Sequence, residues 1–132
     1  MSATAPSTSA EPILLIEDEP SVIAFLRAAL VRRGYAVVHA ASGTEGLEKL
    51  SDGRYTGVIS DIRMPGAVNG ADVHAWIQKN RPELGSRIIL ISGDTANSET
   101  QELLARSGTP CIAKPFRVQE LITIVEKTFG KP

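Results

Sequence analysis

The chain has 132 residues, enough for one domain that buries about two thirds of its unfolded surface. Its 14 Lys and Arg nearly balance its 15 Asp and Glu, and the formal charge of −1 argues against direct binding to nucleic acid or to a membrane surface. The longest apolar run, residues 22–26, is too short to span a bilayer, and the first residues lack the regions of a signal peptide. A single cysteine, Cys111, fits a reducing compartment, so we expect a cytoplasmic protein.

Residues 1–11 are small, polar and Pro-containing, and we expect them to form a disordered leader because they offer little apolar surface to offset ordering. Residues 12–132 then form the single domain. Within it, strand-like and helix-like segments alternate five times. The expected strands are β-branched or Leu-rich and apolar on both faces, and they lie near residues 13–17, 35–39, 57–60, 87–91 and 111–113.

Each expected strand is followed by a segment with helical spacing of its apolar residues. The expected helices cover about residues 20–33, 42–52, 70–80, 98–106 and 117–129. Five strand–helix repeats joined by right-handed crossovers predict an α/β fold with a doubly wound parallel sheet and helices on both faces.

Capping signals mark several helix ends. The first helix ends at two arginines followed by Gly34, which suits the left-handed exit of a helix. The pairs Ser42 with Glu45 and Ser98 with Gln101 have the spacing of capping boxes, and they predict the starts of the second and fourth helices.

Five polar residues follow apolar runs directly, where the strands should end: Glu17, Asp18, Asp61, Ser92 and Lys114. A parallel sheet brings all five to its carboxyl edge, where open α/β sheets bind ligands. Neighbouring carboxylates raise one another's pKa unless a cation neutralises them, so three acids at one edge predict a hard divalent metal such as Mg²⁺. Taken singly, each residue could be an ordinary cap, turn residue or solvated charge, but the combination favours a functional site.

Four strings carry a family resemblance: ILLIEDEP, VISDIRMPG, ILISGD and AKPF, in this order and at these intervals. They closely resemble the receiver domain of response regulators in two-component signalling, of the stand-alone or hybrid-kinase type. The likeness covers about residues 13–129. It implies a flavodoxin-like (βα)5 fold with strand order 2-1-3-4-5.

By this resemblance, Asp61 is the phosphoacceptor, which attacks the phosphohistidine of a histidine kinase or histidine phosphotransfer protein. The resemblance implies that Lys114 neutralises the phosphoryl oxygens and that Ser92 donates its hydroxyl to them. Pro115 is expected to follow a cis peptide bond. Such a domain catalyses only its own phosphorylation and dephosphorylation. It then switches the binding of a downstream protein, and a homodimer is possible.

The metal ligands implied by the resemblance are Asp18 and Asp61 directly, Glu17 through water, and the backbone carbonyl of Arg63. The chain departs from the usual pattern in four ways. Glu17 stands where Asp is frequent, the loop MPGAVNG is one residue longer, and Cys111 replaces an aromatic residue. We expect Cys111 to be a small buried hydrophobe rather than a reactive thiol. No output domain follows Pro132, so a stand-alone or excised receiver is expected.

Two other functions compete with a phosphoacceptor. A phosphatase that forms an aspartyl intermediate would need a second Asp two residues after Asp61, where the chain has Arg63. A pseudo-receiver that only binds a partner is disfavoured by the intact set of acids, hydroxyl and lysine. We also predict that Arg63 and Asp94 approach each other or the phosphoryl group and slow hydrolysis.

The remaining candidates are weak. His39 and His74 lack ligand spacing, so neither metal binding nor a phosphohistidine role is expected. Trp76 is expected to lie with Val73 and Ile77 in the buried stripe of the third helix.

Overall fold

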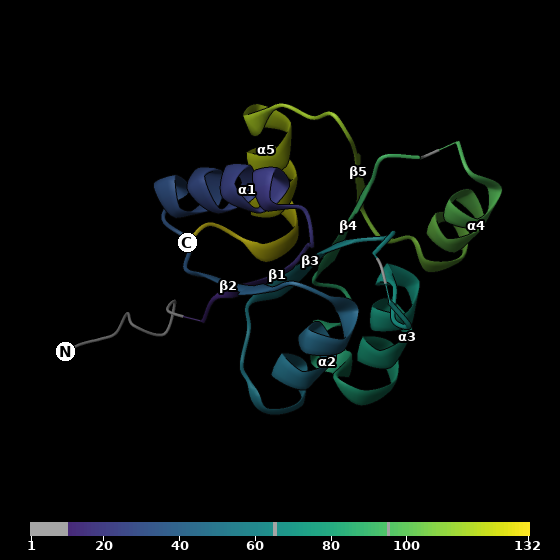
Figure 1. The fold of residues 1–132 in the computed structure, drawn as a ribbon. Coiled ribbons are helices and arrows are strands. Elements are labelled where there is room, and N and C mark those ends of the chain that lie inside the picture. The colour runs from purple at the N-terminus through teal and green to yellow at the C-terminus, as the bar shows by residue number, and fades with distance from the viewer. Residues whose placement is uncertain (1–10, 65, 95) are drawn as a thin grey trace.

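The computed structural model describes residues 11–64, 66–94 and 96–132, so the expected leader lies outside the described residues apart from Glu11. Five parallel strands form one sheet in the order β2-β1-β3-β4-β5, as predicted (Figure 1). The strands are β1 Ile13–Ile16, β2 Val37–Ala40, β3 Gly57–Asp61, β4 Ile88–Ser92 and β5 Cys111–Ala113. The reversal of strand order at β1 and β3 leaves the carboxyl ends of these two strands facing an open crevice.

Helices cover both faces of the sheet. In Figure 1, α1 and α5 lie on one face, and α2, α3 and α4 lie on the other. The helices are α1 Pro20–Arg33, α2 Gly43–Asp52, α3 Gly70–Asn80, α4 Ser98–Ser107 and α5 Val118–Phe129, with a short 3₁₀ turn, η2, at Pro82–Leu84. No helix in the described part of the chain is long and apolar enough to cross a membrane.

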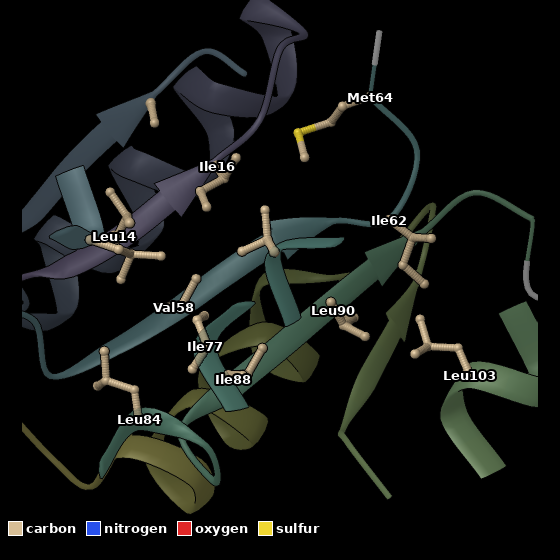
Figure 2. Packing of buried hydrophobic residues seen from close by; sticks show 13 residues of the cluster. Leu14, Ile16, Val58, Ile62, Met64, Ile77, Leu84, Ile88, Leu90 and Leu103 are labelled. Atoms are coloured by element: carbon tan, nitrogen blue, oxygen red, sulfur yellow. The ribbon is translucent and has the colours of Figure 1, made fainter. Parts of the chain in front are cut away.

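The strands are apolar on both faces because each face packs under a helix layer. Leu14 and Ile16 belong to the layer under α2 and α3, whereas Ile13 and Leu15 belong to the layer under α1 and α5. Figure 2 shows the first layer, in which strand residues meet side chains such as Ile77. All four residues of β1 are fully buried, and each such side chain contributes about 1.5–3 kcal/mol through burial.

The helix ends confirm some of the predicted signals. Gly34 leaves α1 with a positive φ of 113°, and its N–H reaches the carbonyl of Leu30. The Ser42 hydroxyl caps α2 by accepting the N–H of Glu45 at 3.1 Å. The Glu45 carboxylate, however, accepts the N–H of Ala41 at 2.9 Å, one residue earlier than a capping box requires.

The predicted capping box of Ser98 and Gln101 is wrong. The N-cap of α4 is Asn97, whose side-chain oxygen accepts the N–H groups of Glu99 and Thr100. Asparagine is at least as good an N-cap as serine, so the helix starts from Asn97 and Ser98 becomes its first helical residue. The start of α3 carries a true capping box, formed by Asn69 and Asp72, which the sequence analysis did not identify.

The start of β2 and the buried face of α3 differ from expectation. The second strand starts at Val37 rather than at residue 35, because the Tyr35 N–H bonds to the Leu30 carbonyl and closes the turn after α1. On α3, His74 is buried with Val73 and Ile77, whereas Trp76 is only partly buried.

Candidate functional site

The topology brings all five predicted polar residues to the carboxyl edge of the sheet. Glu17 and Asp18 follow β1, Asp61 ends β3, Ser92 ends β4, and Lys114 follows β5. Strands β1, β3, β4 and β5 are consecutive neighbours, so their ends lie side by side. The residues are therefore gathered by the parallel sheet itself rather than by a long loop.

The three acids form one cluster. Glu17, Asp18 and Asp61 each offer a carboxylate oxygen, and these oxygens lie within 4.8 Å of one another. Glu17 and Asp61 are buried, with 0% and 5% of their surface exposed, whereas Asp18 is exposed. Hard cations such as Mg²⁺ bind carboxylate oxygens, and one exposed acid leaves room for the water molecules that Mg²⁺ retains.

Lys114 reaches the cluster from the loop after β5. Its Nζ lies 2.7 Å from Asp61 Oδ2 and 3.6 Å from Glu17 Oε1. Burial alone would lower the pKa of Lys114, but the hydrogen bond to Asp61 and the nearby carboxylate charges outweigh burial and raise this pKa. The side chain therefore stays an ammonium ion beside Asp61.

Glu17 carries the least compensated charge of the site. Burial first of all, followed by the charge of Asp61, raises its pKa from 4.5 to about 7, although Lys114 and a backbone N–H oppose the shift. Its Oε2 accepts the N–H of Glu19 at 3.2 Å, but its buried Oε1 has no hydrogen-bond donor among the described residues. A buried acid oxygen without a donor is what a metal ion or its bound water would satisfy, so the residues present fit Mg²⁺.

The Asp61 carboxylate is held at both oxygens. Oδ2 binds Lys114, and Oδ1 accepts the N–H of Arg63 at 3.2 Å. Gly70 is a supporting residue that the sequence analysis missed. A Cβ at Gly70 would lie 2.4 Å from the Asp61 carbonyl oxygen, so only glycine lets α3 start directly against this loop. The Asn69-Gly70 pair just before the apolar stripe of α3 is the sequence signal for this contact.

Ser92 and Lys114 are placed by adjacent strands. Ser92 is 2% exposed, and its hydroxyl oxygen accepts the N–H of Asp94 at 3.0 Å, which leaves the hydroxyl proton for another acceptor. The N–H of Lys114 donates to the Ser92 carbonyl at 2.8 Å. The peptide bond between Lys114 and Pro115 is cis, as expected.

Comparison with known proteins decides the family. The family model described as the response regulator receiver domain matches residues 13–126. The chain belongs to this family. The resemblance inferred from the four strings is thereby confirmed, together with the assignment to two-component signalling.

The relatives are both short and long proteins. Response regulator receiver protein CpdR of Brucella abortus is 30% identical over 115 residues, covering 87% of this chain and 93% of CpdR. Sensor kinase CckA of the same organism is 34% identical over 121 residues, covering 90% of this chain but 12% of CckA. The chain spans less than half the length of several curated relatives.

A solved structure supports the same fold and site. Response regulator TrrA of Thermotoga maritima, in complex with Mg²⁺-BeF, is 32% identical and superposes with a TM-score of 0.77 over 89% of this chain and 98% of that one. The acids of this receiver domain lie at the carboxyl edge of the same fold. They are therefore compatible with Mg²⁺ and with phosphorylation of an aspartate.

Two features of the receiver domain lie at the mouth of the site. The Arg63 guanidinium is 3.9 Å from the Asp94 carboxylate, with side chains 69% and 51% exposed, so the predicted approach of the two residues is confirmed. Beside Lys114, a hollow of about 500 Å³ is lined by residues of α1 and of the loop after β5. Phe25 of α1, 39% exposed, packs on Phe116 there with ring centroids 5.7 Å apart.

The two histidines and the single cysteine of the chain lie in different surroundings. His74 Nε2 lies 2.9 Å from the Thr109 hydroxyl, and this bond joins α3 to the loop before β5. Cys111 is half-buried, and burial together with the nearby Asp61 raises the pKa of its thiol, which disfavours the reactive thiolate. His39 Nε2 lies 2.9 Å from the carbonyl oxygen of Glu17, a contact that sequence spacing did not indicate.

Proposed function

We propose that this receiver domain accepts a phosphoryl group on Asp61 and switches the binding of a partner protein. The observation that carries the proposal is the Asp61 carboxylate itself. It is buried, 2.7 Å from the Lys114 ammonium, and part of a three-acid cluster that fits Mg²⁺. The relative TrrA was solved with Mg²⁺-BeF, which supports the assignment of the metal.

The reaction forms an aspartyl phosphate. A carboxylate oxygen of Asp61 attacks phosphorus, the bond between phosphorus and the donor histidine nitrogen breaks, and its electron pair returns to the imidazole. Lys114 neutralises charge on the transferred phosphoryl oxygens, and the free hydroxyl proton of Ser92 donates to one of them. Such transfers depend on positioning and electrostatics, which this group of residues provides.

Mg²⁺ would be held by Asp18 and Asp61, by Glu17 through a water molecule, and by the backbone carbonyl of Arg63. When bound, it would supply positive charge to the phosphoryl oxygens and would offset the repulsion among the acids. Glu17 then keeps its charge, since a cation lowers the pKa that burial has raised.

Receiver domains interact with histidine kinases and downstream effectors, and the donor proposed here is a histidine kinase or histidine phosphotransfer protein. The similarity to the sensor kinase CckA and to the response regulator receiver protein CpdR supports a donor of this kind. The downstream partner would bind the face formed by α4, β5 and α5. A cytoplasmic location, and a homodimer as one form of the protein, belong to the same proposal.

A phosphatase of the alternative kind would need an Asp at position 63, where this chain has Arg63. Its guanidinium faces Asp94 at the mouth of the site, and it offers no second carboxylate near Asp61. Receiver domains are in general signalling domains rather than enzymes. The chemistry proposed here is likewise limited to phosphorylation and dephosphorylation of the domain itself.

Incubation with acetyl phosphate and Mg²⁺, followed by intact-mass measurement, tests the proposal. We expect the addition of one phosphoryl group, no addition in EDTA, and no addition to Asp61→Asn. Asp52→Asn is a matched control, because this exposed acid ends α2 away from the cluster. A phosphoryl group that persists on Asp61→Asn would place the acceptor elsewhere, and a wild-type chain that stays unmodified would favour a pseudo-receiver.

A further inference from the structure

His39 makes a contact with the acid cluster from outside it. The residue lies on β2, the edge strand of the sheet, and pairs in register with Leu15 of β1. Its ring is partly buried, and Nε2 lies 2.9 Å from the backbone carbonyl oxygen of Glu17. A carbonyl can only accept, so Nε2 must carry the proton in this contact.

The acceptor carbonyl belongs to the peptide bond that joins Glu17 to Asp18. A peptide unit is planar, so the direction of this carbonyl fixes the relative placement of the two α-carbons, from which the Glu17 and Asp18 side chains extend. Both residues are proposed metal ligands. A bond to this one oxygen therefore acts on two acids at once.

The strand β2 holds Glu17 on both sides. The Glu17 N–H donates to the Ala40 carbonyl at 3.1 Å, and the Glu17 carbonyl accepts from the adjacent residue, His39. The loop beyond Glu17 has weaker internal support. Glu19, the N-cap of α1, makes no side-chain capping bond, and its N–H reaches Glu17 Oε2 at 3.2 Å. The His39 bond is therefore a principal restraint on the acid pair.

We propose that His39 is a positioning residue for the metal site: its Nε2–H donates to the Glu17 carbonyl and holds the Glu17-Asp18 peptide in the orientation that directs both carboxylates to one cation. The inference rests on the proposed function, because it assumes that the acid cluster binds Mg²⁺. It assigns a role to a residue that touches neither the metal nor the phosphoryl group. Residues that orient metal ligands in this way affect affinity by about 10–100-fold.

Two substitutions at His39 test the role. His39→Leu removes the donor and keeps an apolar side chain, whereas His39→Gln keeps an N–H donor near the position of Nε2. Val37→Ala is the matched control, since Val37 is a partly buried residue of the same strand and packs on the same face. Mg²⁺ affinity is measured by calorimetry at a temperature where each variant is folded.

We expect His39→Leu to weaken Mg²⁺ binding by about tenfold, and His39→Gln and Val37→Ala to stay within about twofold of wild type. An unchanged affinity in His39→Leu would overturn the inference, as would an equal loss in His39→Gln. If the wild-type chain binds no Mg²⁺, the proposed metal site fails, and the positioning role fails with it.

A second readout needs no metal and no variant. Nitrogen NMR of the imidazole in the metal-free wild-type protein at pH 8 should show the His39 proton on Nε2. A proton on Nδ1 would contradict the donated bond. This result holds even if His39→Leu proves unable to fold.

Discussion

The amino and carboxyl edges of the sheet differ in how fully their partly or fully buried polar side chains are hydrogen-bonded. At the amino edge, Arg87 donates to the Thr56 carbonyl at 2.5 Å, to the Thr56 hydroxyl at 3.2 Å and to the Phe129 carbonyl at 2.6 Å. The Tyr35 hydroxyl donates to the Gly130 carbonyl nearby. At the carboxyl edge, Glu17 is fully buried, yet its Oε1 has no hydrogen-bond donor among the described residues.

The hydrogen bonds at the amino edge serve the stability of the fold, whereas the acids at the carboxyl edge serve the proposed metal site. The cation at the amino edge is matched to carbonyl oxygens, and these bonds tie β3, β4 and the end of α5 together. The carboxyl edge gathers three acids, two of which, Glu17 and Asp61, pair with one lysine, Lys114. A cluster of buried acids with a single cation and too few hydrogen-bond donors lowers stability, so a fold retains it where a ligand will complete the site.

The largest effect is expected from removal of an acid at the carboxyl edge. Asp18→Ala should weaken Mg²⁺ binding by about a hundredfold, because a direct ligand matters at least as much as the groups that orient it. Asp52→Ala should leave the affinity unchanged. Calorimetric titration of both variants checks this prediction, and equal affinities would remove Asp18 from the metal site.

The amino edge should respond in stability and not in metal binding. Arg87→Met should lower the free energy of unfolding by about 2 kcal/mol, because the partly buried carbonyl oxygens of Thr56 and Phe129 lose their donor. Its Mg²⁺ affinity should match wild type. Arg54→Met is the control, since the Arg54 side chain is 87% exposed. Urea denaturation gives the stabilities, and a loss of Mg²⁺ affinity in Arg87→Met would show that the two edges are not independent.

The ion pair at the mouth of the site should have a smaller, kinetic effect. If Arg63 and Asp94 hinder the attacking water, Arg63→Ala should speed the loss of phosphate by several-fold to about tenfold, equivalent to about 1.4 kcal/mol in the barrier. Exposed ion pairs contribute only about 0–1 kcal/mol to stability, so folding should be unaffected. The decay of the phosphorylated mass over time measures the rate. Unchanged rates in both Arg63→Ala and Asp94→Ala would contradict the shielding role.

Strand-end chemistry could be predicted from the sequence, because it depends on local order. Asp61 and Lys114 directly follow apolar runs, and a parallel sheet leaves only one edge where such residues can meet. Helix starts were less predictable. Asn97 and Ser98 are both good N-caps, and their order along the chain does not reveal which side-chain oxygen will accept the free N–H groups of the first helical turn.

Contacts across the sheet were not predictable from spacing. His39 and Glu17 are 22 residues apart, and their bond depends on the parallel register of β1 and β2. Whether Glu17 Oε1 finds a hydrogen-bond donor likewise depends on the distances among the ends of strands β1, β3 and β5. The sequence predicts that acids gather at this edge. Only the three-dimensional arrangement shows that Glu17 is the acid whose buried oxygen lacks a hydrogen-bond donor.

Glu17 should make metal-free stability depend on pH. Its pKa in the folded domain, about 7, lies above the ordinary value of 4.5, so the folded state binds more protons between these values. The contribution of this group to stability is therefore fully present below about pH 4.5 and is lost as the pH rises through about 7. Glu17→Gln removes the titration while keeping an oxygen that accepts the Glu19 N–H.

The central claim is that the buried acid Glu17 lowers the stability of the metal-free domain. The most direct test is the melting temperature of Glu17→Gln minus that of wild type, measured in EDTA from pH 4 to pH 8. We predict a difference near zero at pH 4 that grows to roughly 10 °C in favour of Glu17→Gln at pH 8, where the ionised Glu17 is buried and its nearest cation, Lys114 Nζ, lies 3.6 Å away. Saturating Mg²⁺ should abolish this advantage. A Glu17→Gln variant that melts at or below wild type at pH 8 without metal would contradict the account.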